Sequence, residues 1–226
     1  MPRRWIPITL LTLATVGLIA AVISISVGEN EVQVIQLEET GEVQELIAGI
    51  PQLGNRLGNS NAPVTINLFI DIQCPSCADY AAETVDPVIA EQVRTGEAQI
   101  ILRHRPVGLK PATLGAFGTL AAGEQDRAWQ YAEIFMRNLD QVPERGVDEE
   151  FLNEVAAVTP KLDTATWEAD VVDEEIRNQA VEDDMLAVEL EIPGDTAWVI
   201  DGASGSETLE RAPDLDQVLA AIERVR

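Results

Sequence analysis

The only two cysteines of the 226-residue chain, Cys74 and Cys77, stand three positions apart at the end of an alternating apolar segment. Apolar side chains recur at every second residue from Val64 to Ile72, which is the period of a β-strand. The segment from Ala78 to Arg94 then has the pattern of a helix, and Pro87 predicts a kink inside it. A cysteine pair between a strand and a helix is typical of redox-active α/β domains.

The spacing of the two cysteines favours redox chemistry over a structural role. A disulfide that closes so short a loop removes little conformational entropy from the unfolded chain. Two thiols and the only histidine, His104, fall short of the four ligands of a structural zinc site. At a helix N-terminus, unpaired backbone N–H groups stabilise the thiolate of Cys74, and Cys77 lies one turn further along. This placement predicts a reactive dithiol.

The N-terminal segment predicts export and attachment to the cell membrane. Arg3 and Arg4 precede an uncharged stretch, 5–27, that is long enough to span a bilayer, for which about 20 residues suffice. The flank beyond it is acidic, so the N-terminus is expected inside and the remainder of the chain on the extracytoplasmic side. A signal peptide cleaved near Ser24–Ser26 is the alternative, and it also exports the domain.

The balance of charge excludes nucleic-acid partners. The chain has 15 Lys and Arg residues against 39 Asp and Glu residues, a formal net charge of −24. Such a surface repels phosphate backbones, so we expect protein partners and, through the N-terminal helix, the membrane.

The order of the predicted elements indicates an α/β domain with a helical insertion. Residues 1–28 are expected to be the cytoplasmic tip and transmembrane anchor, 29–56 an extracytoplasmic stalk, and 57–226 one domain. After the strand and helix around the dithiol, a second strand is expected at 98–102 and a helical insertion at about 111–190. The remaining predicted elements are helices at 42–48, 111–123, 125–139, 149–158, 173–190 and 213–225, and strands at 198–200 and 207–210.

The sequence around the dithiol resembles the DsbA-like branch of the thioredoxin superfamily. The resemblance rests on the segments 57–65 and 69–77, on Pro87, and on the segment 121–125 with Trp129, and it covers about residues 57–226. It implies a thioredoxin fold and thiol–disulfide exchange with exported protein thiols or disulfides. It further implies that Cys74 is the nucleophile and Cys77 the resolving thiol, that the cysteine pair works without a cofactor or a bound metal, and that a redox partner recycles it.

Two positions depart from the family pattern. Ser76 stands where strongly oxidising members carry a histidine between the cysteines. Thr196 aligns with a proline that faces the active site in the family, and Pro193 falls three residues early. The alignment brings Asp195 and Thr196 to the dithiol, where we expect them to bind substrate. A carboxylate beside a thiolate raises the pKa of the thiol, whereas a hydroxyl or N–H donor lowers it.

Two other functions stay open. Ser76 and Thr196 favour a thioredoxin-like binding module with weakened catalysis, and the dithiol also suits metal capture across a dimer with four thiolates. Whether exchange runs as oxidation, reduction or isomerisation depends on a redox potential that residue patterns do not resolve. His104 is expected in an exposed loop, with its pKa depressed by adjacent arginines, and Asp71 is expected to form the turn that ends the first strand.

Overall fold

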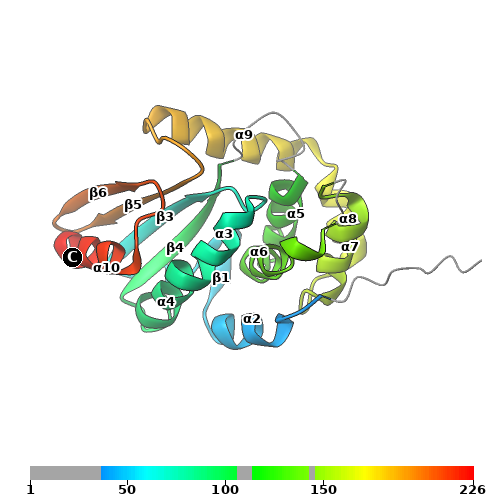
Figure 1. The fold of residues 1–226 in the computed structure, drawn as a ribbon, viewed down its shortest axis with the longest axis horizontal. Coiled ribbons are helices and arrows are strands. Elements are labelled where there is room, and N and C mark those ends of the chain that lie inside the picture. The colour runs from blue at the N-terminus through cyan, green and yellow to red at the C-terminus, as the bar shows by residue number, and fades with distance from the viewer. Residues whose placement is uncertain (1–36, 106–113, 143–145) are drawn as a thin grey trace, which may run out of the picture. The chain divides into compact units, whose positions relative to one another are not determined.

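A six-stranded sheet lies at the centre of the computed structural model, which describes residues 37–105, 114–142 and 146–226 (Figure 1). The strand order is β1-β2-β4-β3-β5-β6, and β3 pairs with β4 in parallel while the other neighbours are antiparallel. The strands are β1 Gln52–Leu53, β2 Arg56–Leu57, β3 Val64–Ile70, β4 Ala98–His104, β5 Thr196–Gly202 and β6 Gly205–Glu210. This mixed sheet and its helices confirm the predicted α/β fold.

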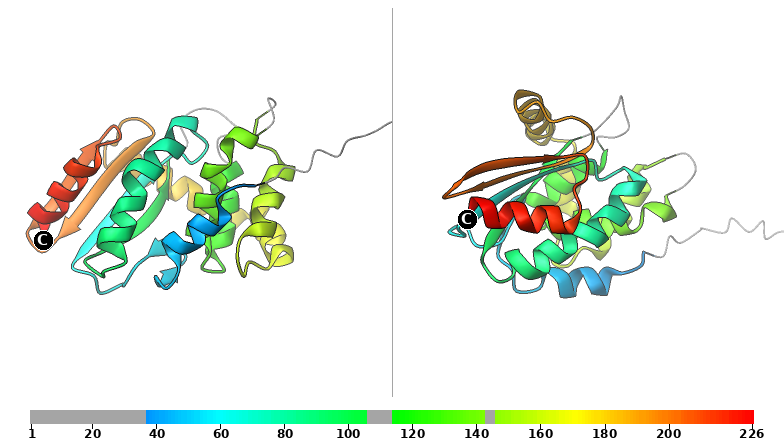
Figure 2. Two further views of the ribbon diagram at one scale, coloured as in Figure 1. Left: turned by 60° about the horizontal axis from the view of Figure 1, so that its bottom comes forward. Right: turned by 60° about the vertical axis from the view of Figure 1, so that its left-hand side comes forward.

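The two faces of β3 pack against different partners. Val64, Ile66, Leu68 and Ile70 belong to the main core, together with the helix that follows the dithiol and the C-terminal helix α10, Leu215–Val225. On the opposite face, Phe69 joins a smaller cluster under α9, Glu174–Glu189. Figure 2 shows α9 on one side of the sheet and α10 on the other. Both faces of the central strand are therefore covered near the dithiol.

The chain after the dithiol is helical from Pro75 to Val93, but its hydrogen-bonding pattern changes along the way. An α-helical start, α3 Pro75–Tyr80, is followed by a π-helical turn, the short α4 Asp86–Val88, and a second π-helical turn that ends at Val93. Pro87 offers no N–H and would crowd the carbonyl four residues earlier in a regular α-helix. The wider turns on both sides of α4 accommodate it, as local departures from α geometry commonly do.

The helical insertion between β4 and β5 is confirmed, with one helix more than the sequence predicts. Its helices are α5 Leu114–Gly123, α6 Ala128–Arg137, α7 Glu149–Val158, α8 Thr164–Val171 and α9. The unpredicted helix is α8, whose N-cap Asp163 accepts a hydrogen bond from the backbone N–H of Thr166. Its one buried side chain, Trp167, packs on Tyr131 and donates to the carbonyl of Gly118 at 2.8 Å. Trp129, Tyr131, Phe135 and Trp167 are buried in the main hydrophobic core, which continues from the sheet into the insertion.

The described part of the predicted stalk, 37–56, belongs instead to the folded domain. Helix α2, Thr40–Ile47, buries Val43 and Ile47 in the main core, and the β1–β2 hairpin extends the sheet by pairing with β4. Strands of two residues carry no periodic signal, so the sequence pattern does not reveal them. The predicted membrane anchor lies outside the described residues. Among those that are described, none of the helices combines the length and the hydrophobicity needed to cross a bilayer.

One arginine joins α2, α4 and α6 through a cluster of carboxylates. The guanidinium of Arg137 contacts Glu39 at 2.6 Å, Asp86, and the buried Glu133 at 3.6 Å. Burial, reinforced by the charge of Asp86, raises the pKa of Glu133 to about 8. Glu133 therefore holds its proton at neutral pH, and the helix that carries Pro87 is tied to the insertion at this point.

Candidate dithiol site

A turn stabilised by Asp71 presents the cysteine pair beyond the end of β3. The carboxylate of Asp71 accepts a hydrogen bond from the backbone N–H of Gln73 at 3.0 Å. The backbone carbonyl of Asp71 accepts one from the backbone N–H of Cys74 at 3.1 Å. Asp71 is buried, with 7% of its surface exposed. Its predicted role as the turn-forming end of the strand is confirmed.

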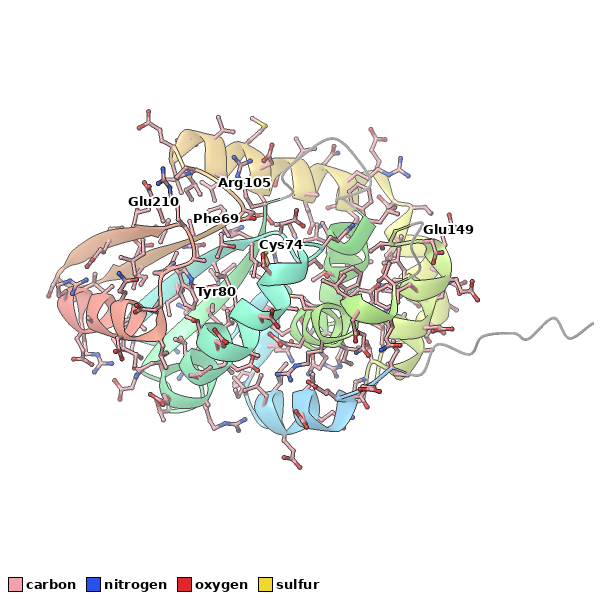
Figure 3. All side chains as sticks on the ribbon, in the orientation of Figure 1. Phe69, Cys74, Tyr80, Arg105, Glu149 and Glu210 are labelled. Carbon is pink, nitrogen blue, oxygen red and sulfur yellow. A yellow bond between two sulfur atoms is a disulfide. The ribbon has the colours of Figure 1, made fainter. Side chains whose placement is uncertain are left out.

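The two sulfurs differ in accessibility. Cys74 is the N-cap of α3 and lies at the start of that helix (Figure 3). Its side chain is partly exposed, whereas Cys77 is 3% exposed within the core. The two residues are joined as a disulfide with their Cα atoms 5.2 Å apart. The hydroxyl of Ser76 lies 3.1 Å from the sulfur of Cys74, within hydrogen-bonding distance. An incoming thiolate therefore reaches Cys74 more readily than Cys77.

Asp195 and Thr196 come to the same pair from the start of β5. The backbone N–H of Asp71 donates to the carbonyl of Asp195 at 2.9 Å, which aligns the two segments side by side. Oδ2 of Asp195 lies 3.8 Å from the sulfur of Cys74, and Oγ1 of Thr196 lies 3.8 Å from the sulfur of Cys77. Both residues thus adjoin the dithiol, one at each sulfur. Their role in substrate binding stays a prediction.

The two residues that follow β6 fix the position of Thr196. The backbone carbonyl of Thr196 accepts hydrogen bonds from the backbone N–H groups of Arg211 and Ala212, at 3.0 and 3.4 Å. Both donors have left-handed backbone conformations, with φ of 63° and 51°, which few residues other than glycine adopt without cost. The chain just beyond β6 is therefore bent where it holds Thr196, which is only 2% exposed.

Two further side chains support the site and were missed by sequence reasoning. The side-chain carbonyl of Gln73 accepts a hydrogen bond from the N–H of Gly115 at 2.6 Å, which links the dithiol turn to α5. The hydroxyl of Tyr80 donates to the carbonyl of Pro213 at 2.9 Å and accepts from the indole of Trp198 at 2.7 Å. Burial raises the pKa of Tyr80, so it stays a neutral donor. The only sequence signal for Tyr80 is its position one helical turn after Cys77.

The prediction that His104 lies in an exposed loop is wrong. β4 continues two residues beyond the predicted end, so His104 pairs with Ile70 and is 1% exposed. Its backbone N–H donates to the carboxylate of Asp183 in α9 at 3.0 Å. The pKa of His104 falls to about 4, chiefly because burial disfavours the charged ring and only secondarily because of Arg103. His104 is therefore a neutral core residue at physiological pH.

Comparison with known proteins agrees with this architecture. The sequence model of the thioredoxin family matches residues 53–192, more than half of the chain. "Probable disulfide bond formation protein D" of Bacillus anthracis is 28% identical over 175 residues, which are 74% of this chain and 76% of the relative. "Disulfide bond formation protein D" of Bacillus subtilis is 21% identical over 191 residues, covering 82% of this chain and 84% of the relative.

Solved structures show the same fold. α-DsbA1 of Wolbachia pipientis superposes with a TM-score of 0.66 at 18% identity, covering 76% of this chain and 89% of its own. Oxidised BdbD of Bacillus subtilis superposes with a TM-score of 0.64 at 19% identity, covering 77% of this chain and 96% of its own. The chain therefore belongs to the thioredoxin family, with the DsbA-like fold and the cysteine pair of a thiol–disulfide oxidoreductase.

Proposed function

We propose that the protein exchanges disulfides with exported proteins through Cys74 and Cys77, and that it oxidises them. The observation that carries the proposal is the unequal burial of the pair, because a partly exposed sulfur at a helix start and a buried partner suit the two steps of exchange. The direction is supported by the Bacillus relatives, which are named for disulfide bond formation.

The reaction proceeds by two thiolate attacks. A substrate thiolate attacks the sulfur of Cys74, the Cys74–Cys77 bond breaks, and Cys77 leaves as a thiolate. A second substrate thiolate then attacks the substrate sulfur of this mixed disulfide and releases Cys74. The substrate dithiol loses two electrons and two protons, and the cysteine pair gains them. A redox partner must then remove those electrons for the next turnover.

The neighbours of the pair suit the binding of an extended substrate segment. Asp195 and Thr196 lie at the two sulfurs, so a substrate cysteine bound at Cys74 places its flanking backbone against them. In our proposal the substrate is an unfolded exported chain, and the domain is held by the N-terminal anchor at the extracytoplasmic face of the membrane.

Trapping of the mixed disulfide tests the exchange mechanism. A Cys77→Ser variant retains the thiol of Cys74 but lacks the resolving one. With an unfolded client whose single cysteine carries a small thiol in disulfide linkage, the Cys74 thiolate attacks the client sulfur and the small thiol leaves. The adduct should accumulate, because neither Cys77 nor a second client thiol is present to break it. The matched Cys74→Ser variant leaves only the buried thiol and should accumulate few. Equal trapping by both variants would refute the assigned roles.

The anchor has a separate test. The full chain should sediment with membranes, and its C-terminus should be accessible to protease added outside the cell. Recovery of a soluble mature form that begins near residue 27 would refute the anchor while leaving export intact.

A binding module with weakened catalysis is the second candidate. The Asp195 carboxylate beside Cys74 favours it, because a negative charge there opposes the thiolate on which exchange depends. Turnover with a reduced client separates the two functions: a binding module captures the client but forms no disulfide in it.

A further inference from the structure

The cysteine pair and Asp195 bring three metal-binding atoms to one point. The sulfurs of Cys74 and Cys77 and a carboxylate oxygen of Asp195 all lie within 4.8 Å of one another. Thiolate sulfur is a soft ligand and carboxylate oxygen a hard one, and Zn²⁺ is the abundant divalent cation that accepts both. These atoms belong to one chain, so the group needs no second subunit.

The spacing of these atoms suits a tetrahedral centre. With Zn–S near 2.3 Å and Zn–O near 2.1 Å, adjacent sulfur and oxygen ligands stand about 3.6 Å apart. The sulfur of Cys74 and Oδ2 of Asp195 are 3.8 Å apart. Two thiolates on one zinc stand about 3.8 Å apart, so the sulfurs must separate once their bond is reduced. Cysteines three positions apart are a usual spacing for zinc ligands, so the backbone permits that separation.

Two hydroxyls complete the surroundings of the sulfurs. Ser76 Oγ lies 3.1 Å from the sulfur of Cys74, and Thr196 Oγ1 lies 3.8 Å from that of Cys77. Hydroxyl donors to coordinating thiolates orient them and compensate part of their charge. The net charge of −24 also raises the local concentration of cations around the domain.

We propose that the reduced protein binds one Zn²⁺ per chain through Cys74, Cys77 and Asp195, and that this binding blocks disulfide exchange. The disulfide first takes up two electrons and two protons from a dithiol, which is oxidised to a disulfide. Zn²⁺ then displaces the thiol protons and holds both thiolates, so neither attacks a disulfide while the metal is bound. With three protein ligands, the fourth coordination position stays open to water. The oxidised pair has no thiolate and binds no zinc.

Zinc titration of the full chain in detergent tests this proposal. The protein is reduced with a phosphine, which competes for zinc less than a thiol does, and titrated with Zn²⁺ against a chromogenic chelator. We expect one zinc per reduced chain, release of up to two protons per zinc, and no binding by the oxidised protein. Absence of zinc binding by the reduced chain would overturn the proposal. A stoichiometry of one zinc per two chains would also overturn it in favour of a shared four-thiolate site.

Asp195→Asn tests the third ligand, with Asp79→Asn as the matched control. Changing a residue that only orients a ligand costs 10- to 100-fold in affinity, so loss of a ligand should weaken zinc binding at least about tenfold. Asp79 is exposed on the same helix as the cysteines, and its substitution changes the net charge equally. It should leave affinity within about twofold. Equal affinities for the two variants would exclude Asp195 as a ligand, provided that both show the wild-type circular dichroism spectrum.

Zinc binding does not depend on the proposed exchange activity. Inactivity of the metal-free protein together with full zinc binding would refute only the proposed function. Rapid exchange by a protein that binds no zinc would refute only the metal site.

Discussion

Replacing Asp195 by Asn should make the Cys74–Cys77 pair more oxidising. The carboxylate lies 3.8 Å from the sulfur of Cys74, so in the reduced protein it repels the thiolate there. At this distance the repulsion is about 1 kcal/mol with the dielectric constant of water and about 4 kcal/mol with an effective value of 20. Because Cys74 is partly exposed, the lower part of this range applies. The pKa of the Cys74 thiol should accordingly fall in the variant, because the thiolate is no longer repelled.

The same repulsion can be expressed as a redox potential. For a two-electron couple, 30 mV corresponds to about 1.4 kcal/mol, so removing the charge should raise the potential by roughly 25 mV, and by less than about 90 mV. Equilibration with glutathione buffers, followed by alkylation of free thiols and gel analysis, measures the potential. The alkylation rate against pH measures the pKa of the Cys74 thiol.

The control for this experiment is Asp79→Asn, which removes an equal charge from an exposed position on the helix of the cysteines. Exposed charges are screened by salt, so its shift should be smaller and should disappear at high ionic strength. An unchanged potential for Asp195→Asn, or a shift to a more negative value, would refute the electrostatic argument.

Three further substitutions and one control test other parts of the structure. Thr196→Val keeps the shape of the side chain but removes the hydroxyl beside Cys77. One hydrogen bond that favours the reduced form contributes roughly 0.5–1.5 kcal/mol, so its loss should lower the redox potential of the cysteine pair by about 10–30 mV in the same glutathione assay. Between about pH 4.5 and about pH 8, Glu133 keeps its proton in the folded protein and loses it in the unfolded chain, so the wild type loses stability as pH rises. Glu133→Gln lacks this proton and should gain stability relative to the wild type over the same range. Urea unfolding at several pH values measures the difference, and parallel pH profiles for the two proteins would contradict it. Gly118→Ala places a methyl group against the buried ring of Tyr131 and should lower the free energy of unfolding by about 1–3 kcal/mol. The control is Gly41→Ala, whose methyl group meets open space on α2 and should raise the free energy of unfolding by up to about 1 kcal/mol. Equal melting temperatures for the two variants would refute the packing argument.

The parts of the fold that could be predicted carry their signal locally. β3 alternates between buried and half-buried side chains over residues 64–68, and α7 begins and ends at the residues that its apolar period indicates. The dithiol is identified by its position between strand and helix, which needs no tertiary information. The placement of Asp195 and Thr196 at the sulfurs came from the family resemblance, since no local pattern points to them.

What could not be predicted depends on contacts between distant residues. His104 is buried because its strand continues to a point where Asp183, 79 positions later, accepts its backbone N–H. Helix α8 is eight residues long with one buried side chain, too few for a periodic pattern. The hairpin of β1 and β2 is stabilised by pairing with β4 and has no strand signal of its own.

The outer edge of β6 bears on how such a protein avoids aggregating with unfolded chains. β6 is the last strand of the sheet among the described residues, and its far edge offers backbone groups to any extended chain. Glu207 and Glu210 lie on this strand, and Arg224 pairs with Glu207 from α10. Charged side chains on an edge strand oppose the addition of another strand, which is the step that starts cross-β assembly. An extended client is thus discouraged from adding to the sheet along β6.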